Sequence, residues 1–138
     1  MNITKNFVIE EFIDPATYER FGDKSTWFIN PDIVNIFQAV RDRFGPITVN
    51  SWHVGGNRKY SGFRPVGSPY HSNYSQHSFG NAGDGILKNV TAEEVREDIR
   101  SNQEFWINLG LGGVENKVSW LHLDTRYNAS GRIKFFNP

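Results

Sequence analysis

Two short stretches carry most of the chemical information in this chain: Ser75-Gln76-His77-Ser78-Phe79-Gly80-Asn81-Ala82-Gly83-Asp84 and Trp120-Leu121-His122-Leu123-Asp124. They contain two of the four histidines, and the chain has no cysteine. Neutral imidazole and carboxylate groups are good zinc ligands, and three protein ligands plus a water are typical of a catalytic zinc site. Structural zinc sites usually have four ligands, often thiolates. We therefore predict a zinc site held by His77, Asp84 and His122.

The spacing within the first stretch is compatible with shared coordination. His77 and Asp84 are seven residues apart, with Gly80 and Gly83 between them. Glycine lets the backbone turn tightly, so both side chains can face one metal without a continuous helix. The alternative is a histidine that caps a loop and an aspartate in an Asx-turn. That alternative is favoured for an isolated pair, whereas the complete motif and a third ligand favour the metal site.

The second stretch has the alternation of a strand. Successive side chains of a strand point to opposite faces, so Trp120, His122 and Asp124 share one face. Asp124 could orient His122, orient an arginine, or take a proton from a metal-bound water. The alternative is a half-buried strand whose polar face meets solvent.

The spacing Ser-x-His-x-x-Gly-x-Ala-x-Asp, followed by Trp-x-His-x-Asp, resembles the M15 peptidases. This family includes zinc D-alanyl-D-alanine carboxypeptidases and phage endolysins that cut peptidoglycan stem peptides. The resemblance extends to residues 7–12, to residues 30–45 and to Ser61-Gly62-Phe63-Arg64-Pro65, and so covers most of the chain. It implies a hedgehog-type fold and a zinc peptidase that works through a metal-activated water.

The chain departs from the carboxypeptidase branch at one position. There, an acid three residues before the last histidine activates the zinc water, and here that position is Ser119. Serine cannot serve as a general base near neutral pH. Other members carry His-x-Asp, as this chain does. We therefore predict Asp124 as the base or base-orienting group, with Glu115 in the preceding loop as the alternative.

The resemblance also implies a role for Arg64, which would bind the carboxylate or carbonyl oxygen of the substrate. A planar guanidinium suits both bidentate carboxylate recognition and stabilisation of a developing oxyanion. Two alternatives remain open: Arg64 is a surface arginine before a proline turn, or Ser51-Trp52-His53 occupies that place in the motif. His71 is interpreted as a solvated loop histidine, with a place in the cleft as the alternative.

The sequence predicts one α+β domain over residues 1–138, with helices packed on a small antiparallel sheet and the zinc site in a cleft. Capping residues followed by proline, or by a capping box at Thr91, predict where the helices begin. The predicted helices cover 15–21, 31–44, 92–103 and 104–109, and the predicted strands cover 47–52, 118–124 and 133–136, the last two paired. The irregular segment 53–83 is long for a loop, which favours a role in shaping a substrate cleft.

Composition argues against several classes of partner. The chain has 15 basic and 15 acidic residues. This neutrality argues against nucleic acid and against an anionic membrane surface as partners. No segment approaches the roughly 20 apolar residues of a membrane span, and the first six residues lack the apolar stretch of a secretory signal. We expect a monomer that acts on peptidoglycan peptides.

For such a protein we expect a phage origin, with action on the host cell wall or association with the virion; otherwise it would be cytoplasmic. A second hypothesis, motivated by Ser119, is a non-catalytic metal-binding module on the same fold that binds a wall peptide or a virion partner. A third, a carbohydrate-cleaving enzyme, would need two acids facing each other across a cleft without metal. Nothing in the spacing favours it.

Overall fold

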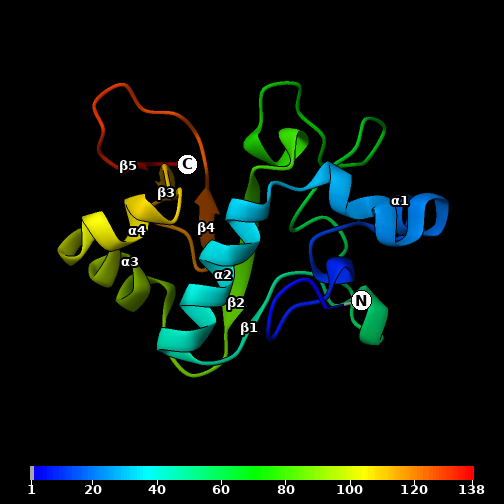
Figure 1. Cartoon of the computed structure of the whole chain (residues 1–138), viewed down its shortest axis with the longest axis horizontal. Coiled ribbons are helices and arrows are strands. Elements are labelled where there is room, and N and C mark those ends of the chain that lie inside the picture. Colours follow the sequence, from blue (N-terminus) through cyan, green and yellow to red (C-terminus); the bar gives the residue numbers. More distant parts are fainter. Residues whose placement is uncertain (1) are drawn as a thin grey trace.

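Helical segments and short strands alternate along the chain in the computed structural model, which describes residues 2–138 (Figure 1). The helices are α1 (Pro15–Phe21), α2 (Pro31–Phe44), α3 (Ala92–Ser101) and α4 (Gln103–Asn108). The strands are β1 (Ile47–Thr48), β2 (Ala82–Leu87), β3 (Gly113–Glu115), β4 (Leu121–Asp124) and β5 (Lys134–Phe136). Short 3-10 helices lie at η1 (Ile9–Glu11), η2 (Gly22–Phe28), η3 (Trp52–Val54) and η4 (Gln76–Phe79). The predicted α+β single domain is confirmed.

The five strands form one sheet in the order β1-β2-β4-β3-β5. All neighbouring pairs are antiparallel except β3 and β5, which are parallel. The sheet is therefore mixed and not antiparallel throughout as predicted, and the expectation that the last strand pairs beside residues 118–124 is wrong. Both edges of β4 are occupied, by β2 and by β3. The last strand therefore cannot pair with β4, and it joins the outer edge of β3.

The central strand β2 is absent from the sequence prediction because two of its six residues are glycines, which are depleted in strands. A Cβ on Gly83 would lie 2.7 Å from the Phe37 ring of α2. A Cβ on Gly85 would lie 2.5 Å from the Ile47 side chain of β1. The glycines that weaken the strand pattern therefore allow close packing on this face of the sheet.

Three of the four helices begin where the sequence predicts. The side chain of Asp14 accepts a hydrogen bond from the Thr17 amide, and that of Asn30 accepts one from the Asp32 amide. At α3, Thr91 forms the predicted capping box with Glu94. Helix α2 then buries an apolar face, which consists of Ile33, Val34, Ile36, Phe37 and Val40.

Two predicted strands are shorter than expected because their backbone groups bond elsewhere. The segment after β1 turns toward the N-terminal region, where the Asn50 amide donates to the Glu11 carbonyl at 2.9 Å. Before β4, the carbonyls of Val118 and Trp120 accept hydrogen bonds from the buried Arg96 of α3, at 2.7 and 2.8 Å. These carbonyls are thus bonded to a side chain in place of a neighbouring strand.

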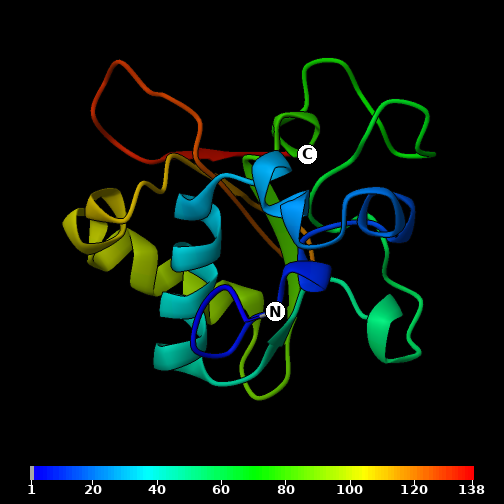
Figure 2. The ribbon, with the colours of Figure 1, turned by 45° about the vertical axis from the view of Figure 1, so that its right-hand side comes forward.

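The long irregular segment lies to one side of the sheet. In both ribbon views α3 and α4 lie on one side of α2, and the chain between β1 and β2 lies on the other (Figures 1 and 2). That segment contains only η3 and η4, so the predicted irregular character is confirmed up to the start of β2. No helix among residues 2–138 is long and apolar enough to cross a membrane.

Candidate metal centre

The three predicted metal ligands come from three different elements. Asp84 on β2 and His122 on β4 are directly opposite each other in the antiparallel pair, so their side chains are neighbours on one face. His77 lies in η4, where the Ser75 side chain accepts a hydrogen bond from the His77 amide. Gly80 ends η4 in the left-handed conformation, with φ of 72°. This turn returns the chain into β2 and brings His77 toward the strand pair.

The side chains meet at distances that suit a metal ion. Asp84 Oδ1 lies 2.8 Å from His122 Nδ1 and 3.3 Å from His77 Nε2. One ligand atom from each residue lies within 4.8 Å of the others. Ligands about 2.0–2.1 Å from a tetrahedral zinc ion are spaced on the order of 3.3 Å apart. The structure therefore brings the predicted group together as a possible metal site.

The remaining polar atoms of these ligands are bonded outward. His77 Nδ1 lies 2.8 Å from the Gly62 carbonyl oxygen, and Nε2 is the ring nitrogen that faces Asp84. His122 Nε2 lies 2.8 Å from Asp124 Oδ2, and Asp84 Oδ2 accepts from Arg64 Nη2 at 3.1 Å. Metal-binding histidines typically have such partners, which fix ring orientation. Two imidazoles and one carboxylate, oriented in this way, fit a zinc ion.

Burial and hydrogen bonding shift the pKa values of His122 and Asp84 in opposite directions. Burial by itself lowers the pKa of His122, but its hydrogen bonds to Asp124 and Asp84 outweigh burial and raise the pKa to about 9. Burial would raise the pKa of the Asp84 carboxyl, yet the hydrogen bonds from His122 and His77 hold it well below its usual range. Without metal, His122 therefore carries a proton between two carboxylates near neutral pH.

We expect the zinc affinity to rise with pH up to about 9. Zinc binding requires a neutral His122, so each ion bound below that pH displaces the proton that the pKa of about 9 retains. The apparent affinity should increase about tenfold per pH unit between pH 7 and 9 and then level off. Competition with a chelator of known affinity measures this slope. A flat profile over that range would show that His122 is not a ligand.

The zinc-free protein should show the corresponding change in stability. The pKa of His122 is about 9 in the folded protein and near 6.5 otherwise. Its contribution to stability is therefore complete below about pH 6.5 and is lost as the pH rises through 9.

Asp124 is fixed on both carboxylate oxygens. It is fully buried; Arg126 Nε donates to Oδ1 at 2.8 Å, and Arg126 Nη2 donates to Oδ2 at 2.7 Å. Burial would raise the pKa of Asp124, but the hydrogen bonds from His122 and Arg126 lower it to about 2. Of the three roles considered for Asp124, this geometry favours orienting His122 and an arginine over accepting a proton from water.

Glu115 is the acid that faces the open side of the group. A cavity of about 370 Å³ beside the three ligands is lined by Glu115 and by His77, Asp84, Trp120, His122 and Arg126. Val114 of β3 pairs with Leu123, so Glu115 is the next residue toward His122 on the neighbouring strand. Its carboxylate makes no hydrogen bond or ion pair with any residue between 2 and 138. This carboxylate is free to meet a water in the cavity.

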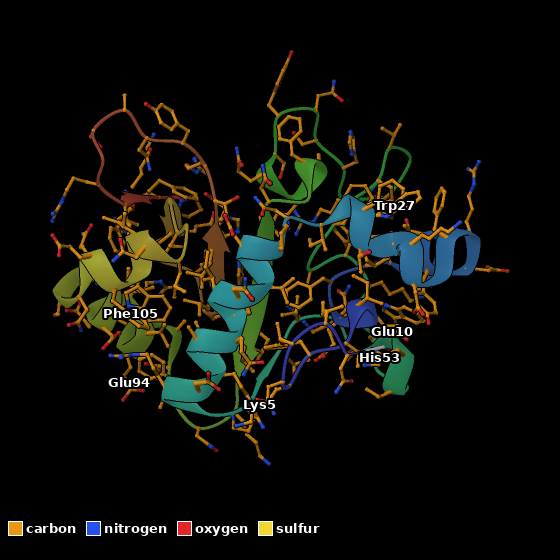
Figure 3. All side chains as sticks on the ribbon, viewed as in Figure 1. Lys5, Glu10, Trp27, His53, Glu94 and Phe105 are labelled. Carbon is orange, nitrogen blue, oxygen red and sulfur yellow. The ribbon has the colours of Figure 1, made fainter. Side chains whose placement is uncertain are left out.

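Arg64 lies at the site, as the resemblance implied. Its Nε donates to the Tyr60 carbonyl at 2.7 Å and its Nη2 donates to Asp84. Trp52 donates to the Ile13 carbonyl instead, and His53 lies in η3, which contacts η1, the 3-10 helix that contains Glu10 (Figure 3). Segment 51–53 therefore does not take the place of the arginine element.

His71 is attached to the arginine loop and is not a ligand. Its Nδ1 lies 2.9 Å from the Arg64 carbonyl oxygen and 3.3 Å from Ser78 Oγ. These contacts tie the loop that carries Arg64 to η4. His71 is thus a partly buried loop histidine that supports the cleft wall.

Two residues of the site, Arg126 and Arg58, were not predicted from the sequence. Arg126 follows Asp124 by two residues, and the two-residue period of an extended chain would have placed both on one face. Arg58 donates to the Asp84 carbonyl at 3.1 Å. No local sequence pattern predicts this contact, because the two residues are 26 positions apart and meet only in the tertiary fold.

Comparison with protein-family models, with curated proteins and with solved structures found no match to this chain. A function for this protein is therefore inferred from the residues of the site and their geometry.

Proposed function

We propose that this protein is a zinc-dependent peptidase of the M15 type that hydrolyses peptidoglycan stem or cross-link peptides. One observation supports it most directly. One ligand atom from each of His77, Asp84 and His122 lies within 4.8 Å of the other two, while the other polar atom of each is held by Gly62, Arg64 or Asp124. Such a three-residue set with an open side is typical of catalytic zinc sites.

Each residue has a distinct task in this proposal. A bound zinc ion supplies Lewis acidity and lowers the pKa of a water ligand toward about 7. Glu115 takes the proton of the attacking water and later delivers it to the leaving amine. Arg64 steadies a substrate oxygen as negative charge develops on it. Asp124 and Arg126 keep the His122 ring in place.

The substrate class and the setting are inferred from the resemblance. Peptidoglycan peptides are the targets implied by the two histidine motifs, and we propose a monomeric, phage-encoded protein that acts on the host wall or is associated with the virion. The zero net charge is consistent with a partner other than nucleic acid or an anionic membrane surface.

A second candidate function is a non-catalytic metal-binding module for a wall peptide or a virion partner. Ser119 motivates it, because the acid of the carboxypeptidase branch is absent there. Glu115 argues against it, because this carboxylate lines the cavity beside the ligands. The two functions therefore differ in whether Glu115 supports turnover.

Hydrolysis of purified peptidoglycan tests the proposal. We expect the zinc-loaded protein to release new amino termini and a chelated sample to release none, with metal content measured on both. Zinc bound stoichiometrically without cleavage of any wall type would favour the binding module. Cleavage that persists after complete removal of metal would contradict the zinc mechanism.

A further inference from the structure

A second and larger cavity adjoins the metal group. Its volume is about 670 Å³, and it shares Arg64, Asp84 and Trp120 with the cavity that holds the ligands. Because these three residues line both spaces, a peptide lying across the metal group would place a neighbouring part of its chain in the second cavity. The side chains that line the second cavity would therefore help to select the peptide substrate.

The lining of this second cavity has an excess of positive charge. It includes Arg58, Lys59 and Arg64, and the one acid is Asp84. The Asp84 oxygens are already occupied, Oδ1 by the two histidines and Oδ2 by Arg64. Lys59 is exposed and forms no ion pair among residues 2–138. The cavity therefore offers uncompensated positive charge to a ligand.

The Arg58 side chain is fixed in the wall of this cavity by two hydrogen bonds. Its Nε donates to the Val49 carbonyl at 2.7 Å and its Nη2 donates to the Asp84 carbonyl at 3.1 Å. Its amide donates to Ser51 Oγ at 3.2 Å. A guanidinium that is already ordered loses little side-chain entropy when it binds a ligand. The two side-chain hydrogen bonds use Nε and Nη2, so Nη1 can still donate to an anion.

Aromatic side chains complete the walls. The rings of Tyr60 and Tyr70 have centroids 6.0 Å apart, and the Arg64 guanidinium lies 6.0 Å from the Tyr70 centroid. Trp120 lines both cavities. Apolar ring surface beside a cation excludes some water and so strengthens its attraction for an anionic group. This combination suits a peptide that carries a carboxylate.

We propose that the cavity formed by Arg58, Lys59, Tyr60 and Tyr70 is a specificity subsite for a free carboxylate on the peptide substrate, next to the bond that is cut. The inference rests on the proposed peptidase function and goes beyond it by naming the group that selects the substrate. The carboxylate can come from an acidic side chain or from the chain terminus.

Four matched stem peptides distinguish these sources. The side-chain carboxylate is free or amidated, and the C-terminal carboxylate is free or amidated. With the zinc-loaded full chain, we expect amidation of the recognised carboxylate to lower kcat/KM by about 10- to 100-fold, the range of a charge-assisted hydrogen bond. Lys59→Glu should reduce this preference to near unity. Lys5→Glu makes the same charge change outside both cavities (Figure 3) and should keep the preference.

The outcomes separate this inference from the proposed function. A preference for one free carboxylate that is lost in Lys59→Glu supports the subsite and identifies its source. Equal cleavage of all four peptides overturns the subsite while the peptidase function stands, as does a preference that Lys59→Glu leaves unchanged. Calorimetry of the four peptides with the Glu115→Gln variant measures binding without any cleavage. Carboxylate-dependent binding there supports the subsite even if no peptide is cut, and equal binding of all four peptides overturns it.

Discussion

Replacing Glu115 with glutamine is expected to lower kcat for peptide hydrolysis by about 10²- to 10⁴-fold, the usual contribution of a general base. Zinc should remain bound stoichiometrically, because Glu115 lines the cavity without belonging to the group of three ligands. The measurement is kcat at saturating zinc, with metal content determined on the same sample. Glu104→Gln, an exposed acid on α4, is the matched control and should retain full activity.

Asp124→Asn should behave differently from Glu115→Gln. Asp124 bonds to His122 Nε2 and to Arg126, and its side chain is fully buried. Loss of such a partner typically weakens metal binding by about 10- to 100-fold. We therefore expect activity of Asp124→Asn to recover substantially at high zinc. Full activity of Glu115→Gln, together with loss in Asp124→Asn that zinc does not restore, would return the role of base to Asp124.

Alanine at His77 or His122 should weaken zinc binding by more than about 100-fold, since removal of a ligand exceeds the effect of losing its outer partner. Dissociation constants measured with a competing chelator test this. His53→Ala and His71→Ala are the controls, because neither histidine belongs to the group of three ligands. Stoichiometric zinc retained by both ligand variants would exclude the proposed site.

The two ligand variants should differ in stability. His122 lies between Asp84 and Asp124, at 2.8 Å from each carboxylate. Its removal takes one charged hydrogen bond from each carboxylate, at a cost of about 1.5–3 kcal/mol per bond, while Asp84 keeps Arg64 and His77 and Asp124 keeps Arg126. His77→Ala should be milder, because Asp84 keeps its bonds to His122 and Arg64. His77→Ala therefore tests the metal site in a folded protein, and urea unfolding of the zinc-free variants compares the two.

Local signals in the sequence determined the helix starts and the ligand set. Asp14, Asn30 and Thr91 cap their helices because each needs only a backbone amide within three residues. His77 and Asp84 were identified from a spacing within one short segment, and that segment folds back on itself at Gly80. These features depend on near neighbours in the chain, so the sequence alone was sufficient to predict them.

Tertiary structure decided the rest, because the remaining features depend on partners far along the chain. β2 gives a weak local pattern, since its glycines are needed for packing against Phe37 and Ile47. β5 pairs with β3 in place of β4, because both edges of β4 are already filled. Strand register places Glu115 beside the open cavity, and Arg126 engages Asp124 from the chain beyond β4. The candidate metal-binding residues could thus be predicted from two short motifs, whereas the positions of Glu115 and of the basic residues around the second cavity depend on how distant segments pack together.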